Sequence, residues 1–333
     1  MKTELVELIE KNRKKESRQL LEKQVKDLIK EVETRDRIIE AYKSYTPNKV
    51  KIIKKENRTA DKEGTVITLL SDIHAEHKII KSTTSGINEY SPDICSDRLS
   101  KYFRILVNLT ELKRGELPLD NLVMGLLGDL IHGFIHGEYL RTNYMTPLEA
   151  MLFIVDELKS GFNYILQHGQ FKNIVVVCKI GNHSRITDKV YTDEEALYSY
   201  EWVIYHLLAH EFQNKIKFII ENGYFTYYQI YDKTLRFHHG HGFRYAGGIG
   251  GLYVPLQRYR LKVNQQRRAD LGLIGHWHTT DFLRNTKTLI NGSVCGFDAY
   301  AMRFGFEPEP PQQQFLIQDS KRGFTINTPI ILE

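Results

Sequence analysis

Residues 65–74 read TVITLLSDIH, an apolar run followed closely by an aspartate and a histidine. Its first six residues are apolar or β-branched and carry no charge, which predicts a buried strand at residues 65–70. Asp72 and His74 follow directly, where the strand ends. Loops at the carboxyl ends of strands are where α/β folds build their functional sites. We therefore expect a strand that leads into a site.

Strands and helices alternate in the residues that follow. Apolar runs predict strands at residues 121–127 and 173–179, and amphipathic patterns predict helices at residues 97–112, 147–167 and 193–212. Closely spaced strands come next, at residues 216–220, 225–230, 235–238, 271–274, 282–284, 288–290 and 314–317, together with a helix at residues 252–263. This order predicts an α/β body whose C-terminal half is richer in antiparallel pairs.

Polar residues of a restricted kind stand at or just after the ends of five of these strands. The five segments are Asp72-Ile73-His74, Gly128-Asp129, Gly181-Asn182-His183, His238-His239-Gly240-His241 and Gly275-His276-Trp277-His278. They offer carboxylate, amide and imidazole ligands and no thiolate. This set suits Mn, Fe or Zn and excludes a structural zinc site of the cysteine type.

The spacing within the segments also favours metal binding. Alternate residues of an extended strand end point to the same side, so the D-x-H and H-W-H pairs can reach one metal or two adjacent metals. A glycine before Asp129, Asn182 and His276 lets the backbone turn sharply and approach closely. The carboxylate of Asp129 can bridge two cations about 3.5–4 Å apart, a pair that clamps a phosphate and generates hydroxide.

In this order the five segments resemble the motifs of the calcineurin-like metallophosphoesterases, which run D-x-H, G-D, G-N-H, a later H often before Gly, and G-H-x-H. The resemblance covers about two-thirds of the chain, from Asp72 to His278. It implies a four-layer α/β/β/α sandwich with two metals. The first metal would be bound by Asp72, His74 and His278, the second by Asn182, His239 and His276, and both by the bridging Asp129. His183 would contact the phosphate and protonate the leaving oxygen.

The sequence departs from the family pattern after G-N-H. The family usually has Asp or Glu there, a residue that helps hold the histidine, and here Ser184 and then Arg185 follow. His183 can still be the acid, and Arg185 can clamp phosphate. In the fourth segment, His239 is chosen as the ligand because it directly precedes Gly, which leaves His241 as a candidate substrate contact. His132 and His136 either line the cleft or lie on the surface.

The motifs leave the substrate open. The motif order and the basic N-terminal arm resemble SbcD-type DNA exonucleases and phage-encoded members of the family, which favours DNA as the substrate. A basic and aromatic stretch at residues 253–268 adds to this, or is simply a solvated helix face. The alternatives are a phosphomonoesterase or nucleotide phosphodiesterase, and a non-catalytic assembly module, against which the intact ligand set counts.

The composition is that of a globular protein. Hydrophobic residues make up 41% of the 333 residues and charged residues 26%, which excludes disorder for most of the chain. No apolar run approaches the roughly 18 residues that span a bilayer, and the N-terminus lacks the apolar region of a signal peptide. The three cysteines, Cys95, Cys178 and Cys295, form no disulfide framework or CxxC site. We therefore expect a reducing, cytoplasmic location and no membrane partner.

The basic charge belongs to the N-terminal arm. Residues 1–60 hold 17 Lys and Arg against 11 Asp and Glu, a net charge of +6. Residues 61–333 hold the remaining 29 Lys and Arg and 30 Asp and Glu, a net charge of −1. Residues 3–44 have strong helix composition. Heptad positions run through Leu21, Val25, Leu28, Val32, Arg35, Ile39 and Tyr42. We expect a helical extension at residues 1–60 and a catalytic domain at residues 61–333. The extension is a coiled coil for self-association, a DNA-contact arm, or a helix packed on its own domain.

Overall fold

The computed structural model of the protein describes residues 21–30, 32, 33, 36, 40, 62–135, 137, 139–244 and 251–333. The chain divides into two units, Met1–Asn57 and Arg58–Glu333. In the first unit residues 21–30 are helical, and the heptad side chains Leu21, Val25 and Leu28 are exposed. Most of the remaining expected helix, and the expected boundary between residues 60 and 61, lie outside the described residues.

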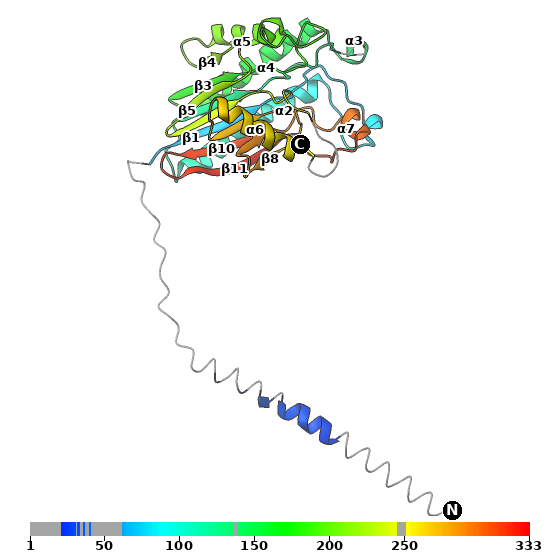
Figure 1. Cartoon of the computed structure of the whole chain (residues 1–333), viewed down its shortest axis with the longest axis vertical. Coiled ribbons are helices and arrows are strands. Elements are labelled where there is room, and N and C mark those ends of the chain that lie inside the picture. The colour runs from blue at the N-terminus through cyan, green and yellow to red at the C-terminus, as the bar shows by residue number, and fades with distance from the viewer. Residues whose placement is uncertain are drawn as a thin grey trace, which may run out of the picture. The chain divides into compact units, whose positions relative to one another are not determined.

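Two mixed β-sheets form the centre of the second unit (Figure 1). The first has the order β11-β10-β1-β2-β3-β4 and the second β5-β6-β7-β9-β8. The strands of the first sheet are β1 (Gly64–Leu70), β2 (Asn121–Leu126), β3 (Asn173–Cys178), β4 (Lys217–Ile220), β10 (Gln312–Asp319) and β11 (Gly323–Ile331). Those of the second are β5 (Thr226–Ile230), β6 (Lys233–Phe237), β7 (Leu271–Ile274), β8 (Asp281–Leu283) and β9 (Thr288–Ile290).

The strands that lead into the five polar segments are parallel neighbours within each sheet. In the first sheet β1 pairs with β2 and β2 with β3 in parallel, while β10 and β11 add antiparallel pairs. In the second sheet β6 pairs with β7 in parallel, and β5 and β8 are antiparallel edge strands. The carboxyl ends of the leading strands therefore lie side by side within each sheet.

Helices cover the outer face of each sheet, which gives four layers. Helices α2 (Pro92–Arg114), α4 (Pro147–His168) and α5 (Tyr200–Glu211) pack against the first sheet. Helix α6 (Tyr253–Gln266) packs against the second, where Leu256 contacts Ile274 and Ile290. The core between the sheets includes Ile67 of β1 and Phe237 of β6. The expected α/β/β/α sandwich is confirmed.

Local sequence signals explain where the helices begin. Ser91 caps α2, with a proline in the first turn, and Thr146 and Glu149 form a capping box at α4. The single helix expected at residues 193–212 is wrong. Ser199 is extended and accepts from the backbone N–H of Glu201, so a 3-10 turn at Glu195–Tyr198 ends before α5 begins.

The sequence missed several elements near the C-terminus and in loops. Strand β11 lies at the edge of the first sheet, alternates between exposed and half-buried residues, and contains Pro329, which an edge strand tolerates. The short helices α3 (Tyr139–Thr142) and α7 (Ala299–Arg303) were also not expected. None of the described helices is long and apolar enough to cross a membrane.

Candidate metal centre

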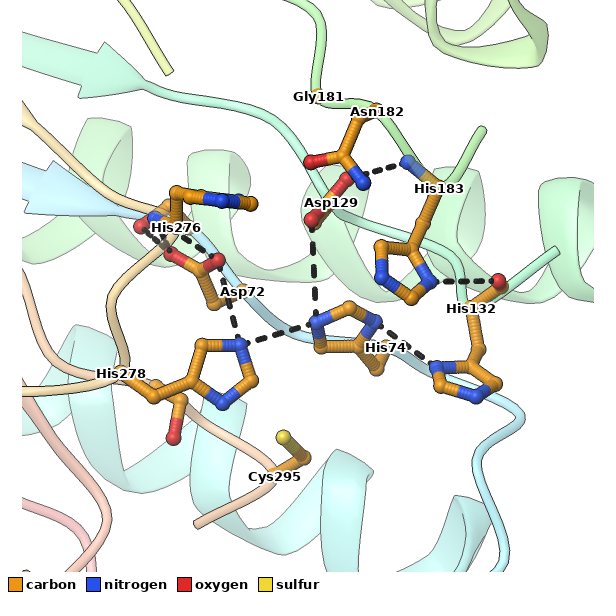
Figure 2. Close-up of polar contacts among 12 residues, drawn as sticks. Asp72, His74, Asp129, His132, Gly181, Asn182, His183, His276, His278 and Cys295 are labelled. Atoms are coloured by element: carbon orange, nitrogen blue, oxygen red, sulfur yellow. Dashed lines mark hydrogen bonds and ion pairs between the residues drawn. The ribbon is translucent and has the colours of Figure 1, made fainter. Parts of the chain in front are cut away.

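The structure brings all seven sequence-predicted metal ligands to one place, at the carboxyl ends of five strands, and Figure 2 labels all of them except His239. Strands β1, β2 and β3 of the first sheet lead to Asp72 and His74, to Asp129, and to Asn182; strands β6 and β7 of the second lead to His239, and to His276 and His278. Four of them, Asp72, His74, Asp129 and His239, are buried, whereas the other three are half-buried. The cluster therefore has a solvent-facing side.

The first predicted ligand group lies around His278. Its Nε2 atom is 3.4 Å from Asp72 Oδ1 and 3.2 Å from His74 Nε2 (Figure 2). His74 Nε2 in turn lies 4.0 Å from Asp129 Oδ2. Nitrogen and oxygen atoms with lone pairs thus converge on a small space, as they do around a bound cation.

The second group lies around His239. Its Nε2 atom is 3.0 Å from Asp129 Oδ2, 3.2 Å from Asn182 Oδ1 and 3.2 Å from His276 Nδ1. The other ring nitrogen, Nδ1, donates to the carbonyl of Leu127 at 2.7 Å, which leaves Nε2 free as a ligand atom. Asp129 therefore faces both groups.

Residues of the described part of the chain form four groups whose three ligand atoms all lie within 4.8 Å of one another. The groups are Asp72–His74–Asp129, Asp129–His239–His276, His74–His132–His183 and His74–His278–Cys295. The first two correspond to the two predicted sites. The donor set of carboxylate and imidazole fits divalent transition metals.

The charges in the cluster depend on Asp129. Burial alone would raise the pKa of Asp129, but His239 and His183 hold it well below its usual range. Burial alone would lower the pKa of His239, but the neighbouring Asp129 carboxylate raises it to about 9. Without a cation, the two residues therefore form a buried ion pair.

The ligands leave the strands through an uncommon backbone conformation. Asp72, His74, Asp129, His276 and His278 have φ angles of 53°, 48°, 52°, 71° and 53°. A left-handed conformation costs a non-glycine residue on the order of 1–3 kcal/mol and clusters at functional sites. The expectation that D-x-H and H-W-H lie on extended strand ends is wrong, since the strands end at Leu70 and Ile274 and the ligands lie in the loops that follow.

Glycines next to the ligands allow the loops to touch. Gly128 has a φ of +92°, and a Cβ atom there would overlap the backbone of Gly181. A Cβ atom on Gly181 would overlap Asp129 itself, and one on Gly275 would lie 2.6 Å from Asp72 Oδ2. The expected close approach before Asp129, Asn182 and His276 is confirmed.

Buried polar residues that the sequence did not reveal hold Asp72 in place. Ser71 Oγ donates to Asp72 Oδ2 at 2.5 Å, and Asn291 Nδ2 donates to Ser71 Oγ at 2.8 Å. Asn291 Nδ2 also donates to Gln313 Oε1 at 2.6 Å. The backbone N–H of His276 lies 3.0 Å from both carboxylate oxygens of Asp72. This network joins strands of both sheets to the first ligand.

Glu201 of α5 clamps the loops that carry Asp129 and Asn182. Its carboxylate accepts from the backbone N–H of Leu130 at 2.6 Å and of Gly181 at 2.7 Å. Burial, and then the charge of Asp129, raises the pKa of Glu201 to about 8. In the sequence, this role could have been suspected because Glu201 lies on the same helix face as Ile204 and Tyr205, where apolar side chains are usual.

His183 is held by a backbone carbonyl. Its Nδ1 atom lies 3.1 Å from the carbonyl oxygen of His132, and its backbone N–H donates to Asp129 Oδ1 at 2.8 Å (Figure 2). The side chain that follows His183 in the sequence takes no part in this contact. Ser184 is buried and bonds Ser199 Oγ at 2.7 Å instead. Burial lowers the pKa of His183, and Asp129 opposes that shift.

The two predicted substrate contacts have partners within the protein. The Arg185 guanidinium donates to the carbonyls of Asn182 at 2.7 Å and Thr187 at 3.0 Å. His241 Nε2 lies 2.7 Å from Glu195 Oε1. Their roles toward a substrate stay predictions. His132 is buried, with Nδ1 3.1 Å from His74 Nδ1, whereas His136 lies outside the described residues.

A scan against protein-family models and a search of curated proteins each found no match. Among solved structures, an archaeal phosphodiesterase is similar with a TM-score of 0.38 and 14% identity, over 80% of this chain and 99% of that one. YfcE, a phosphoesterase from E. coli, is similar with a TM-score of 0.32 and 14% identity, over 80% of this chain and 100% of that one. Vps29 from Entamoeba histolytica, complexed with zinc, is similar with a TM-score of 0.33 and 12% identity, over 80% of this chain and 99% of that one. These similarities are too low to assign an activity, so the reaction is inferred from the residues of the site.

Proposed function

We propose that the chain is a calcineurin-like metallophosphoesterase, a phosphoester hydrolase with two divalent cations. The observation that carries this proposal is the position of Asp129. Its Oδ2 atom is 3.0 Å from His239 Nε2 and 4.0 Å from His74 Nε2, so one carboxylate serves both ligand groups. A shared carboxylate between two open cation sites is the arrangement of two-metal phosphoester hydrolysis.

Two bound cations would polarise the phosphate and supply hydroxide at neutral pH. Asp72, His74, Asp129 and His278 would hold one cation, and Asp129, Asn182, His239 and His276 would hold the other. His183 donates its Nδ1 proton to the His132 carbonyl, so its Nε2 atom is the one that passes a proton to the leaving oxygen. Mn²⁺ is the favoured cation for this oxygen and nitrogen set, with Mg²⁺, Fe²⁺ and Zn²⁺ as alternatives.

His183→Ala is expected to lower the hydrolysis rate about 10²–10⁴-fold while both cations stay bound, because it removes an acid and no ligand. The rate is measured with bis(p-nitrophenyl) phosphate, and bound metal by elemental analysis. His210→Ala, on the exposed side of α5, is the matched control and should match the wild type. Loss of one metal equivalent from His183→Ala would instead make His183 a ligand and reopen the assignment of Asn182.

We infer DNA as the substrate, so that the enzyme is a nuclease that cleaves phosphodiesters. Support comes from the basic arm and from α6, which carries Arg258, Arg260 and Lys262. Just after this helix, the guanidinium carbon of Arg267 lies 4.1 Å from the centroid of the Tyr227 ring. Incubation with Mn²⁺ and single-stranded DNA, duplex DNA, a generic diester and a monoester separates the possibilities. Cleavage of the monoester alone favours a phosphomonoesterase, and no cleavage at all favours the assembly module.

The N-terminal helix is proposed to join copies of the chain, with DNA contact as the alternative. The heptad residues Leu21, Leu28 and Val32 are 61%, 60% and 47% exposed, which leaves an apolar stripe available to a second helix. A protein that starts near Gly64 is expected to form a smaller assembly by light scattering. If the arm contacts phosphates, the truncation weakens DNA binding and lowers its salt slope by about 0.9 for each lost contact. A change in neither property contradicts both roles.

A further inference from the structure

A cysteine lies beside the first predicted cation site. Ligand atoms of Cys295, His74 and His278 are all within 4.8 Å of one another, and Figure 2 shows the sulfur of Cys295 facing the two imidazoles. The side chain is fully buried. Its Sγ atom makes a long contact of 3.7 Å to the carbonyl of Gly296, and the thiol also hydrogen-bonds the imidazole of His278. The sulfur therefore keeps lone pairs directed at the space that a cation would occupy.

The loop that carries Cys295 is built onto the same site. The backbone N–H of Val294 donates to the carbonyl of Asp72 at 3.0 Å, so the position of the cysteine is tied to that of a predicted ligand. Gly296 makes the turn that follows, with a φ of +78°. The carbonyl of Cys295 accepts from Arg98 at 2.9 Å and from Asn88 at 2.8 Å. Three separate segments thus hold the backbone at Val294 and Cys295 in place.

A positive charge lies close by to offset a thiolate. The Arg98 guanidinium is buried, and its hydrogen bonds go to the carbonyls of Val294 and Cys295 and to the amide oxygen of Asn88. No described carboxylate lies within ion-pair distance of it. A buried cation without an acidic partner is costly. An anionic sulfur on Cys295 would lower that cost.

We propose that Cys295 is a ligand of the cation held by Asp72, His74 and His278, and that this position takes a thiophilic metal such as Zn²⁺, Fe²⁺ or Co²⁺. The inference rests on the proposed two-cation site and changes its expected metal content. Oxygen and nitrogen ligands alone suit Mn²⁺ and Mg²⁺ as well, whereas thiolate favours the softer ions. The second site contains no cysteine and keeps its broader range, so the two positions should differ in selectivity.

Cobalt tests the ligand directly. The full-length protein is stripped with a chelator and loaded with Co²⁺ as wild type, Cys295→Ser and Cys178→Ser. Cys178 is also a buried, free cysteine, at the end of β3 and outside the groups of ligand atoms, so its variant controls for loss of a buried thiol. We expect a near-ultraviolet thiolate-to-cobalt charge-transfer band in the wild type and Cys178→Ser, and its loss in Cys295→Ser. Zinc affinity of Cys295→Ser should fall at least about 10-fold, the scale of losing even an indirect ligand contact.

X-ray absorption of the zinc-loaded wild type needs no variant and is unaffected if Cys295→Ser folds poorly. The proposal requires a sulfur neighbour at about 2.3 Å in addition to nitrogen and oxygen at about 2.0–2.2 Å. Cobalt that binds with visible-region bands but without the charge-transfer band would overturn the role of Cys295 and leave the two-cation site standing. A wild-type protein that binds no metal at all would overturn both.

Discussion

Asp129→Asn is expected to lower phosphodiester hydrolysis at least about a hundredfold, the scale of losing one aligned electrostatic contact at a reacting centre. The amide keeps the size of the side chain but removes its negative charge. Only one of its two polar atoms can accept, whereas the carboxylate faces His239 and His74 through Oδ2 and the His183 backbone through Oδ1. The variant should also bind fewer than two metal equivalents.

The rate is measured with bis(p-nitrophenyl) phosphate and Mn²⁺, and the metal content by elemental analysis of the same sample. Asp232→Asn is the matched control, because Asp232 is exposed in the turn between β5 and β6 and should change neither quantity. A variant at position 129 that hydrolyses the diester at the wild-type rate with metal present would show that Asp129 does not bridge two cations.

Gly181→Ala should disrupt the metal centre although it replaces no ligand residue. The added methyl group would overlap the backbone and carboxylate of Asp129, so the loop after β3 must move away from the loop after β2. That movement also weakens the hydrogen bond from the Gly181 N–H to Glu201, which is 2.7 Å long. Overpacking of this kind typically costs about 1–3 kcal/mol. We expect a lower melting temperature and loss of the cation bound by Asn182, because that residue follows directly.

Gly115→Ala is the control for the added methyl group. Gly115 ends α2 with a φ of −56°, and a Cβ atom there meets nothing within 4 Å. Its stability should stay the same or rise slightly, since alanine restricts the unfolded chain. If Gly181→Ala melts and binds metal like Gly115→Ala, the contact between the two loops does not set the geometry of the site.

The fold was predictable from the sequence wherever burial leaves a local, continuous signal in the residues of one element. The apolar runs of β1 and β3 and the ends of α4 gave elements and bounds within a few residues, because a strand buried on both faces leaves a continuous apolar signal. Strand β11 gave no such signal. One side faces solvent, and Pro329 argues against a strand unless the strand is known to be an edge.

The predicted ligands came together, but what supports them could not be found in the same way. Gln313 meets Ser71 because β10 is the antiparallel neighbour of β1, and Asn291 meets Ser71 from the end of β9 in the other sheet. Both lie more than 200 positions from Ser71 in the sequence. The carbonyl that holds His183 belongs to the backbone of His132, and a backbone atom leaves no trace in residue identity. The left-handed turns at the ligands are likewise set by the loops around them.

The five strands that supply the site belong to different sheets, and each proposed cation draws ligands from both. Asp72 and His74 come from the first sheet and His278 from the second, while Asn182 comes from the first and His239 and His276 from the second. Each cation would therefore act as a cross-link between the two halves of the sandwich. At this end metal coordination would join the sheets, whereas farther along the strands apolar packing that includes Ile67 and Phe237 joins them. Sliding one sheet over the other would change the metal–ligand distances at both cations at once. The packing between the two sheets would therefore set the distance between the two metals.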